Sequence, residues 1–183
     1  MKTLIWKGLY YNSLEYFQWE SANNTHIFRS KIIGSSINDL WFLEYKIITD
    51  KRWLINSFEI SLELNGKKST IIGKRAENKW FINDIENPLF TGIEFIDISI
   101  TPFTNSLPIN YLTLEVGESK ESEVIYLDIL KEEISCLKQK YHRQKKNVYT
   151  YENVQSDFKA DIVVDENGLV VNYPNIFERA FNI

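Results

Sequence analysis

Residues 62–72 read Leu-Glu-Leu-Asn-Gly-Lys-Lys-Ser-Thr-Ile-Ile, and this stretch predicts a β-hairpin. Apolar and polar residues alternate in Leu62-Glu-Leu64, and strand-forming residues follow in Ser69-Thr-Ile-Ile72. Asn65-Gly66 between them is a dipeptide that accepts positive φ at both positions. Alternation with a period of two is typical of a strand that buries one face. Because it recurs along the chain and helical periodicity is scarce, the sequence predicts an all-β protein with a few short helices.

Segments with strand character follow one another closely along the chain. They are residues 3–11, 14–20, 25–33, 40–49, 53–64, 69–75, 78–84, 93–100, 110–116, 123–129, 147–152, 157–165 and 169–173. Asp165-Glu-Asn-Gly168 is a second turn signal, between the last two of them. So many strands exceed a flat sheet, and we expect one curved antiparallel sheet that forms a partly open barrel or half-barrel. No linker or repeat interrupts the series, which predicts a single domain over residues 1–183.

Two segments have helical periodicity. In the first, apolar residues recur at i, i+4, i+7 and i+11, namely Leu130, Ile134, Leu137 and Tyr141. The stretch from Gln139 could equally begin a strand, so we expect that helix to stop near Leu137. In the second segment, Pro174 suits a first helical turn, and Phe177 and Phe181 then lie on one side. We expect this short terminal helix to cover an open end of the sheet.

Composition limits the classes of partner. With 44% apolar and 25% charged residues, the chain resembles an ordinary soluble globular protein, and its single Cys136 excludes an internal disulfide. A net charge of −4 argues against nucleic acid or an anionic membrane as the main partner. Charge interrupts Met1–Gly8 before an apolar run of signal-peptide length develops, and no stretch approaches the roughly 20 apolar residues of a membrane helix. The expectation is a cytoplasmic protein without a transmembrane segment.

Aromatic residues are abundant, with 5 Trp, 10 Tyr and 11 Phe. Large rings fill the curvature of a sheet, and they also line ligand cavities, because a flat ring gives a large contact area at low rotamer entropy. We therefore expect a pocket on the concave side of the sheet, lined by some of Trp6, Tyr45, Trp53, Trp80, Phe95 and Tyr126.

Residues 97–108, Asp-Ile-Ser-Ile-Thr-Pro-Phe-Thr-Asn-Ser-Leu-Pro, join a strand to a constrained polar turn. Each of the two prolines restricts the residue before it to extended backbone. The side chain of Asn105 can form an Asx-turn, and Thr101 and Thr104 add hydroxyl groups. Two interpretations remain open: a rigid corner tied to Asp97, or a polar turn that faces a ligand.

The two neighbouring strand patterns favour a ligand-facing wall. Phe95 and Asp97 share one face of their strand, and Tyr126 and Asp128 share one face of theirs, while isoleucine and leucine occupy the opposite faces. A cavity for an amphipathic ligand needs such a wall, because apolar area provides affinity and a few polar groups fix orientation.

Several stretches together resemble a known family. They are Asp97 to Pro108, Gln139-Lys-Tyr141, Tyr149 and Tyr151, Val164-Asp165-Glu166-Asn167-Gly168-Leu169-Val170, Tyr173-Pro174 and Arg179, with weaker matches at Tyr45, Asp50, Trp53 and Trp80. In these residues the chain resembles the bacterial proteins described as putative glycolipid-binding, over nearly its whole length. The resemblance implies a fold similar to the half-barrels of bacterial lipoprotein carriers, whose concave apolar face shields acyl chains. The chain is expected to depart from those carriers in having no export signal, and this departure favours an intracellular amphiphile over lipoprotein transport.

Catalytic and metal signatures are mostly missing. The chain has no Gly-x-Ser-x-Gly elbow, and His26, His142 and Cys136 do not have zinc-ligand spacing. Together with the absence of these signatures, the family resemblance implies non-catalytic binding of a glycolipid or similar amphiphile, with no cofactor expected. Two alternatives stay open: an enzyme acting on a small hydrophobic substrate through Asp97 or Asp128, and a protein-interaction module. The candidate ligand-binding residues are Asp97, Thr101, Thr104, Asn105, Tyr45, Trp53, Trp80 and Tyr126, with no catalytic residue or metal ligand assigned.

Overall fold

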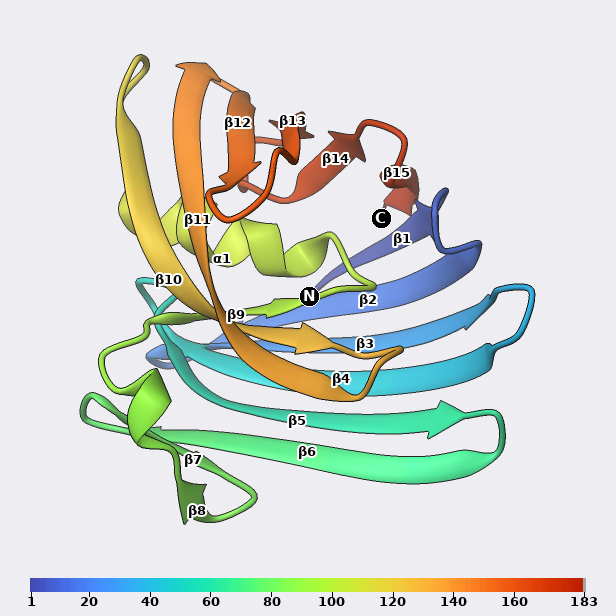
Figure 1. The fold of residues 1–183 in the computed structure, drawn as a ribbon. Helices are drawn as coiled ribbons and strands as arrows, with labels where there is room; N and C mark the ends of the chain where they lie inside the picture. Colours follow the sequence, from blue (N-terminus) through green and yellow to red (C-terminus); the bar gives the residue numbers. More distant parts are fainter. Residues whose placement is uncertain (183) are drawn as a thin grey trace.

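The computed structural model describes residues 1–182, in which one large sheet curls around a short helix (Figure 1). In chain order the elements are β1 (Lys2–Gly8), β2 (Ser13–Ala22), β3 (Thr25–Ser35), β4 (Leu40–Asp50), β5 (Ile55–Leu64), β6 (Lys67–Ala76), β7 (Lys79–Ile82), β8 (Ile85–Glu86), the 3-10 helix η1 (Pro88–Phe90), β9 (Phe95–Ile98), the 3-10 helix η2 (Phe103–Asn105), α1 (Ser106–Leu112), β10 (Ser119–Asp128), β11 (Glu133–Lys145), β12 (Val148–Asn153), β13 (Lys159–Val164), β14 (Val170–Tyr173) and β15 (Phe177–Asn182).

The sheet is a long antiparallel meander whose two ends stay apart. Its strand order is β8-β7-β6-β5-β4-β3-β2-β1-β15-β14-β13-β12-β11-β10-β9, so the first and last strands of the chain pair in the middle. Only the β9–β10 pair is parallel among the described strands. Within residues 1–182 the end strands β8 and β9 do not pair with each other, so the sheet does not close into a barrel. The predicted all-β, curved and partly open sheet is therefore confirmed.

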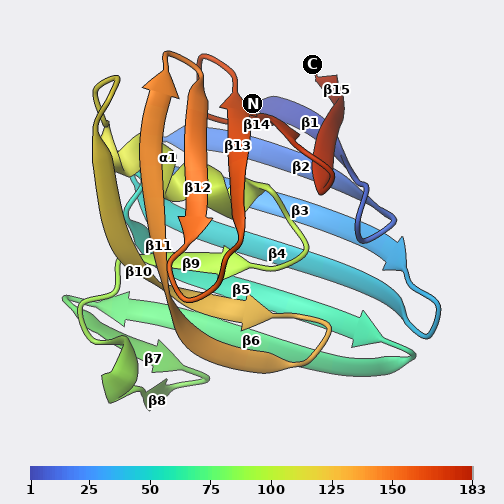
Figure 2. The same ribbon diagram turned by 45° about the horizontal axis from the view of Figure 1, so that its top comes forward.

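The curl brings β9 and α1 into the concave side of the sheet (Figure 2). The Phe103 ring, in η2 after β9, lies 4.5 Å from the Phe28 ring on β3 and 4.7 Å from the Phe17 ring on β2, measured between centroids. At the rim, Lys67 Nζ on β6 contacts a carboxylate oxygen of Glu132 in the β10–β11 turn at 3.0 Å. Aromatic packing thus joins the two halves of the sheet through the β9–η2 segment.

Alternation along each strand determines which side chains enter the core. In β4, Trp41, Leu43, Tyr45 and Ile47 are buried while the residues between them are exposed or half-buried. Burial of one face in this way is the main stabilising contribution of a half-buried strand, at about 25 cal/mol per Å² of apolar surface. The sequence pattern therefore predicts the inward face of the long strands directly.

Both predicted turns are present. Asn65 and Gly66 have φ values of 52° and 81°, and the flanking residues Leu64 and Lys67 are paired across the hairpin. In the second turn, Asp165 Oδ1 accepts hydrogen bonds from the backbone N–H groups of Asn167 and Leu169 at 2.9 and 3.0 Å. Each turn therefore matches the local chemistry that the sequence indicates.

Three sequence-based assignments are wrong. Part of the strand expected at 110–116 belongs to α1, which begins at Ser106 and tolerates Pro108 in its first turn, where a backbone N–H would have no helical partner. The helix expected from Leu130 is instead β11, which pairs with both β10 and β12. The terminal helix expected from Pro174 is the strand β15, which pairs with β1 and β14.

A close approach at Gly73 in β6 gives a stability prediction. Gly73 pairs with Phe58 on β5, and a Cβ atom at Gly73 would overlap the buried Phe58 ring. Because Phe58 packs against Trp80, with centroids 5.7 Å apart, the ring has little freedom to move. We expect Gly73→Ala to lower the free energy of unfolding by about 1–3 kcal/mol in urea denaturation. Thr70→Ala, at an exposed position of the same strand, is the control and should change it by about 0.5 kcal/mol or less.

Candidate ligand-binding cavity

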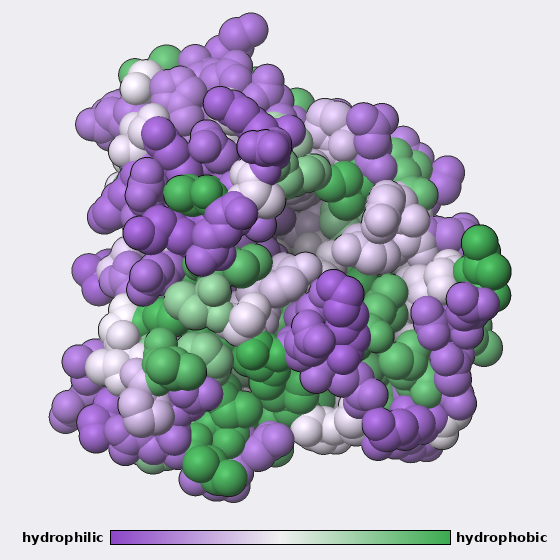
Figure 3. Space-filling view, viewed as in Figure 1, coloured by the Kyte–Doolittle hydropathy of each residue, from purple (hydrophilic) through white to green (hydrophobic). Residues whose placement is uncertain are grey.

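A cavity of about 730 Å³ opens between the β9–η2 segment and the strands β10 to β15, which belong to the same half of the sheet. The space-filling view is hollowed here, beneath the β12–β14 part of the sheet (Figure 3). Its aromatic lining comprises Tyr10, Tyr11, Tyr126, Tyr151, Phe158, Tyr173 and Phe177. The volume of the cavity lies within the usual range for small-molecule binding sites, which are also concave.

The aromatic rings form a connected wall along one side of the cavity. Tyr11 stacks on Phe177 with centroids 6.1 Å apart, and Phe177 lies 6.3 Å from Tyr173. Tyr173 in turn contacts Tyr151 at 6.2 Å in an edge-to-face arrangement, and Phe158 packs against both. Because β12, β14 and β15 are held by the sheet, this wall is preformed.

Asp97 on β9 provides a carboxylate on the opposite side. Its Oδ1 accepts a hydrogen bond from the Thr104 hydroxyl at 2.9 Å, and its Oδ2 accepts one from the Gln139 amide at 2.6 Å. Asp97 is partly exposed and lines the cavity, whereas Thr104 and Gln139 are buried behind it. Burial raises the pKa of Asp97 above its ordinary value, and the two hydrogen bonds offset part of that increase.

The polar turn after β9 is both a rigid corner and part of the cavity lining. The Tyr141 hydroxyl donates a hydrogen bond to Asn105 Oδ1 at 2.9 Å, and the Phe103 N–H donates to the Thr101 hydroxyl at 3.1 Å. Thr101 and Asn105 also line the cavity. The two interpretations of this turn are therefore compatible, because hydrogen bonds to the turn fix the groups that the cavity presents.

The hydroxyls of Tyr11, Tyr126, Tyr151 and Tyr173 in the cavity remain protonated at neutral pH. Burial is the main cause that raises the pKa of Tyr11 to about 12, with smaller contributions from nearby charges. Burial also raises the pKa of Tyr126, Tyr151 and Tyr173, and the negative charge of Asp97 adds to each increase. These phenols can therefore donate hydrogen bonds to a ligand without carrying charge.

The predicted site residues separate into two groups. Asp97, Thr101, Asn105 and Tyr126 line the cavity, and Thr104 lies behind it as the hydrogen-bond donor to Asp97. The remaining three, Tyr45, Trp53 and Trp80, are buried in the hydrophobic core, as are Trp6 and Phe95. Of the aromatic residues expected to line a pocket, the structure thus places Tyr126 in this cavity.

Sequence reasoning did not select the other aromatic residues of the wall, including Tyr11, Tyr151 and Tyr173. Tyr151 and Tyr173, like Gln139, belong to the stretches that carry the family resemblance, which was the available signal. Asp128, considered as a carboxylate of the enzyme alternative, also lines the cavity, where it is ion-paired with Lys131 at 2.9 Å.

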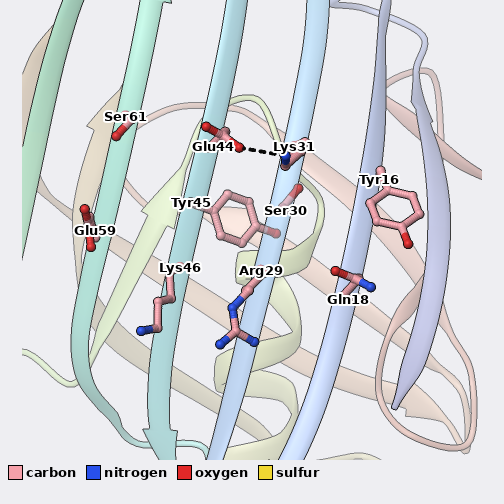
Figure 4. A pocket seen from close by; sticks show the side chains of 10 residues that line it. All are labelled: Tyr16, Gln18, Arg29, Ser30, Lys31, Glu44, Tyr45, Lys46, Glu59 and Ser61. Atoms are coloured by element: carbon pink, nitrogen blue, oxygen red, sulfur yellow. Dashed lines mark ion pairs between the residues drawn. The ribbon is translucent and has the colours of Figure 1, made fainter.

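A second hollow, of about 280 Å³, lies on the convex outer face of β2 to β5 (Figure 4). Its exposed lining is mainly charged, and Lys31 and Glu44 form an ion pair across it at 3.1 Å. The two buried residues at its floor, Ser30 and Tyr45, point their hydroxyls at Glu15 in the core. This hollow lacks an apolar wall, so the cavity beside Asp97 is the stronger candidate site.

Within residues 1–182 no cluster of three or more His, Cys, Asp or Glu side chains could hold a metal ion. No helix in that part of the chain combines the length and the apolar character that crossing a membrane requires.

Comparison with known proteins relates the whole chain to one family. The model of the family described as Putative glycolipid-binding matches residues 3–179. The structure is similar to the crystal structure of a DUF1089 family protein from Pseudomonas aeruginosa, with a TM-score of 0.81 and 27% sequence identity. The similarity covers 90% of this chain and 91% of that chain. No curated protein matches the chain.

Proposed function

The chain belongs to the family described as putative glycolipid-binding, and from that premise we propose that it binds an amphiphile, such as a glycolipid, in the cavity beside Asp97. One observation carries the proposal: a connected wall of aromatic rings faces a short polar segment across a cavity of about 730 Å³. Amphipathic ligands need this combination, since apolar contact provides affinity and convergent polar groups provide orientation.

The arrangement of the lining suggests how such a ligand would lie. One group of polar side chains comes from the β9–η2 side, namely Asp97, Ser99, Thr101 and Asn105, and Asp128, Lys131, Asn153, Lys159 and Asn175 lie elsewhere around the cavity. The facing strands supply the rings, and aromatic rings can stack on the apolar face of a sugar as well as contact an alkyl chain. The head group would therefore bind near Asp97, and the apolar part would extend along the rings.

The cavity supports binding better than the enzyme alternative. Both oxygens of Asp97 accept hydrogen bonds from buried donors, and Asp128 is ion-paired with Lys131. A general base must reach the proton that it abstracts, and a nucleophile needs a base within hydrogen-bond distance. Asp97 and Asp128 are held in structural contacts instead, which favours a role in recognition.

Filling the cavity should weaken binding. Ala160 on β13 lines the cavity, and Ala160→Phe would place a ring in the space where the ligand would lie. With decyl maltoside below its micellar concentration as the probe, we expect titration calorimetry to show at least about a tenfold loss of affinity, because steric exclusion removes the apolar contact.

The matched control is Ala76→Phe, which adds the same ring at an exposed position at the end of β6. This variant should bind decyl maltoside as the wild type does. Equal binding by a folded Ala160→Phe variant would place the ligand elsewhere, and absence of binding by the wild type would contradict the proposal.

A further inference from the structure

Asp97 is a cavity carboxylate that lacks a cationic partner. Its two hydrogen-bond donors, the Thr104 hydroxyl and the Gln139 amide, are both neutral. None of the ion pairs formed within residues 1–182 includes Asp97, although Asp128 in the same cavity is paired with Lys131. Neutral donors stabilise an ionised carboxylate only in part, so a charge here would remain uncompensated.

The lysines that line the cavity do not provide the missing charge. Lys131 Nζ lies 2.9 Å from Asp128 Oδ2, and Lys159 Nζ lies 3.6 Å from Glu152 Oε2. Each lysine is thus neutralised by another acid. When Glu152 is counted with the charged residues of the lining, three carboxylates meet two lysines, and Asp97 is the carboxylate left without a cationic partner.

Several tyrosine side chains line the same cavity as this carboxylate. Asp97 is paired in register with Tyr126 on β10, and its negative charge acts on the hydroxyls of Tyr11, Tyr126, Tyr151 and Tyr173. The faces of tyrosine rings attract cations through the ring quadrupole. Within the described chain the cation–π contacts are Arg52 with Tyr111 and Arg143 with Tyr149, so no cavity tyrosine is used by the protein's own cations.

We propose that this cavity selects an amphiphile whose head group carries a positive charge, an alkylammonium or a protonated amine, with the cation placed between Asp97 and the tyrosine rings. The inference rests on the proposed function, and it narrows the ligand class. A neutral head group could hydrogen-bond to the same side chains but would leave the carboxylate uncompensated. An ammonium group compensates it and also contacts the ring faces.

The test compares three probes that share one alkyl chain. Decyltrimethylammonium, decyl maltoside and decyl sulfate are titrated separately into the wild-type protein below their micellar concentrations. Because the three probes share one alkyl chain, differences in their affinities report on the head group. We expect decyltrimethylammonium, with its positive charge, to bind about tenfold or more tightly than the neutral decyl maltoside, and the negatively charged decyl sulfate to bind weakest.

Variants then assign the preference to the cavity. Asp97→Asn should remove most of the tenfold preference, measured as the ratio of decyltrimethylammonium affinity to decyl maltoside affinity. Asp157→Asn, which changes the net charge equally at an exposed position, is the matched control and should retain the preference. If Asp97→Asn does not fold, Tyr126→Leu serves as the second variant and should lower the ratio of ammonium to maltoside affinity.

The outcomes distinguish this inference from the proposed function. Tight binding of decyl maltoside with no preference for the ammonium probe would overturn the cationic head group and leave amphiphile binding intact. A preference that persists in both Asp97→Asn and Tyr126→Leu would also overturn it. If none of the three probes binds, the proposed function fails as well.

Discussion

Replacing Arg179 with methionine is expected to lower the free energy of unfolding by about 3 kcal/mol, because a nearly buried carboxylate keeps only Lys2, 3.1 Å away, as an ionic partner and the hydrogen bonds of the guanidinium to two backbone carbonyls are lost. Arg179 Nη1 lies 2.9 Å from Asp165 Oδ2, and the two side chains are only 8% and 9% exposed. The guanidinium also donates hydrogen bonds to the carbonyl oxygens of Leu169 and Val170 at 2.7 to 3.1 Å. One side chain therefore links β15 to the turn between β13 and β14.

The position of Arg179 on β15 explains why its contacts with Asp165, Leu169 and Val170 are important. β15 is the strand that pairs with β1, so it joins the two halves of the sheet. The Trp6 ring N–H on β1 donates to the Val170 carbonyl at 2.7 Å, next to the Arg179 contacts. Loss of Arg179 would therefore weaken the junction of the halves.

Urea denaturation of Arg179→Met measures the effect, and Lys7→Met on the neighbouring strand β1 is the control. Lys7 forms an ion pair with Glu178 at 3.5 Å, but both side chains are about half exposed. Exposed pairs contribute roughly 0–1 kcal/mol, so Lys7→Met should have a small effect. Equal losses in the two variants would show that burial does not control the strength of the Arg179 contact.

The fold class could be predicted because the long strands obey the period-two pattern and the turns have distinctive residues. Asn65-Gly66 determines one hairpin locally, and the alternation in β4 determines its buried face. These signals are local in sequence, so no knowledge of the remaining chain is needed. The predicted curvature follows from the number of strands alone.

The first part of β11 was missed because Leu130, Ile134, Leu137 and Tyr141 have helical spacing, and the stretch from Gln139 was recognised only as a possible start of a strand. The inward face of β11 carries Leu137, Gln139 and Tyr141, so a polar amide occupies a position where alternation requires an apolar residue. Gln139 is there because it donates to Asp97, which lies far away in the sequence. Local patterns fail at sites where a buried polar contact has its own partner.

The strand β15 was missed because its structure depends on pairing. Phe177 and Phe181 fit one side of a helix, but β1 and β14 offer hydrogen-bonding edges that a strand satisfies. Tertiary pairing of this kind overrides a weak helical pattern. The cavity wall could not be assembled from sequence for the same reason, since Tyr11, Tyr151 and Tyr173 come from segments that meet only when the sheet curls.

A second large effect is expected from Glu15, which is buried in the core on the inner face of β2. Its Oε1 accepts hydrogen bonds from the hydroxyls of Ser30 and Tyr45, both at 2.7 Å, and its Oε2 has no partner within the described chain. Burial raises the pKa of Glu15 to about 7, although the nearby hydroxyls of Thr101, Tyr45 and Ser30 oppose the increase. At pH values between 4.5 and about 7, the folded protein therefore holds a proton on Glu15 that the unfolded chain, in which the pKa of Glu15 is 4.5, has lost.

The sign of the pH effect follows from this difference. Above pH 7 both states are ionised, and the folded state carries the full cost of a buried charge. As the pH falls from 8 to 5, the folded state takes up the proton first, so Glu15 contributes about 2–3 kcal/mol of additional stability. His26 acts in the opposite direction, because burial lowers its pKa and disfavours its protonated form.

Comparison with Glu15→Gln isolates this contribution from that of His26. The difference in unfolding free energy between wild type and variant should shift by about 2–3 kcal/mol in favour of the wild type when the pH is lowered from 8 to 5. Glu20→Gln on the same strand, where the side chain is 43% exposed, is the control and should leave the pH dependence as in the wild type. Urea denaturation at the two pH values provides the measurement. If Glu15→Gln kept the pH dependence of the wild type, Glu15 would not be the group that exchanges the proton on folding.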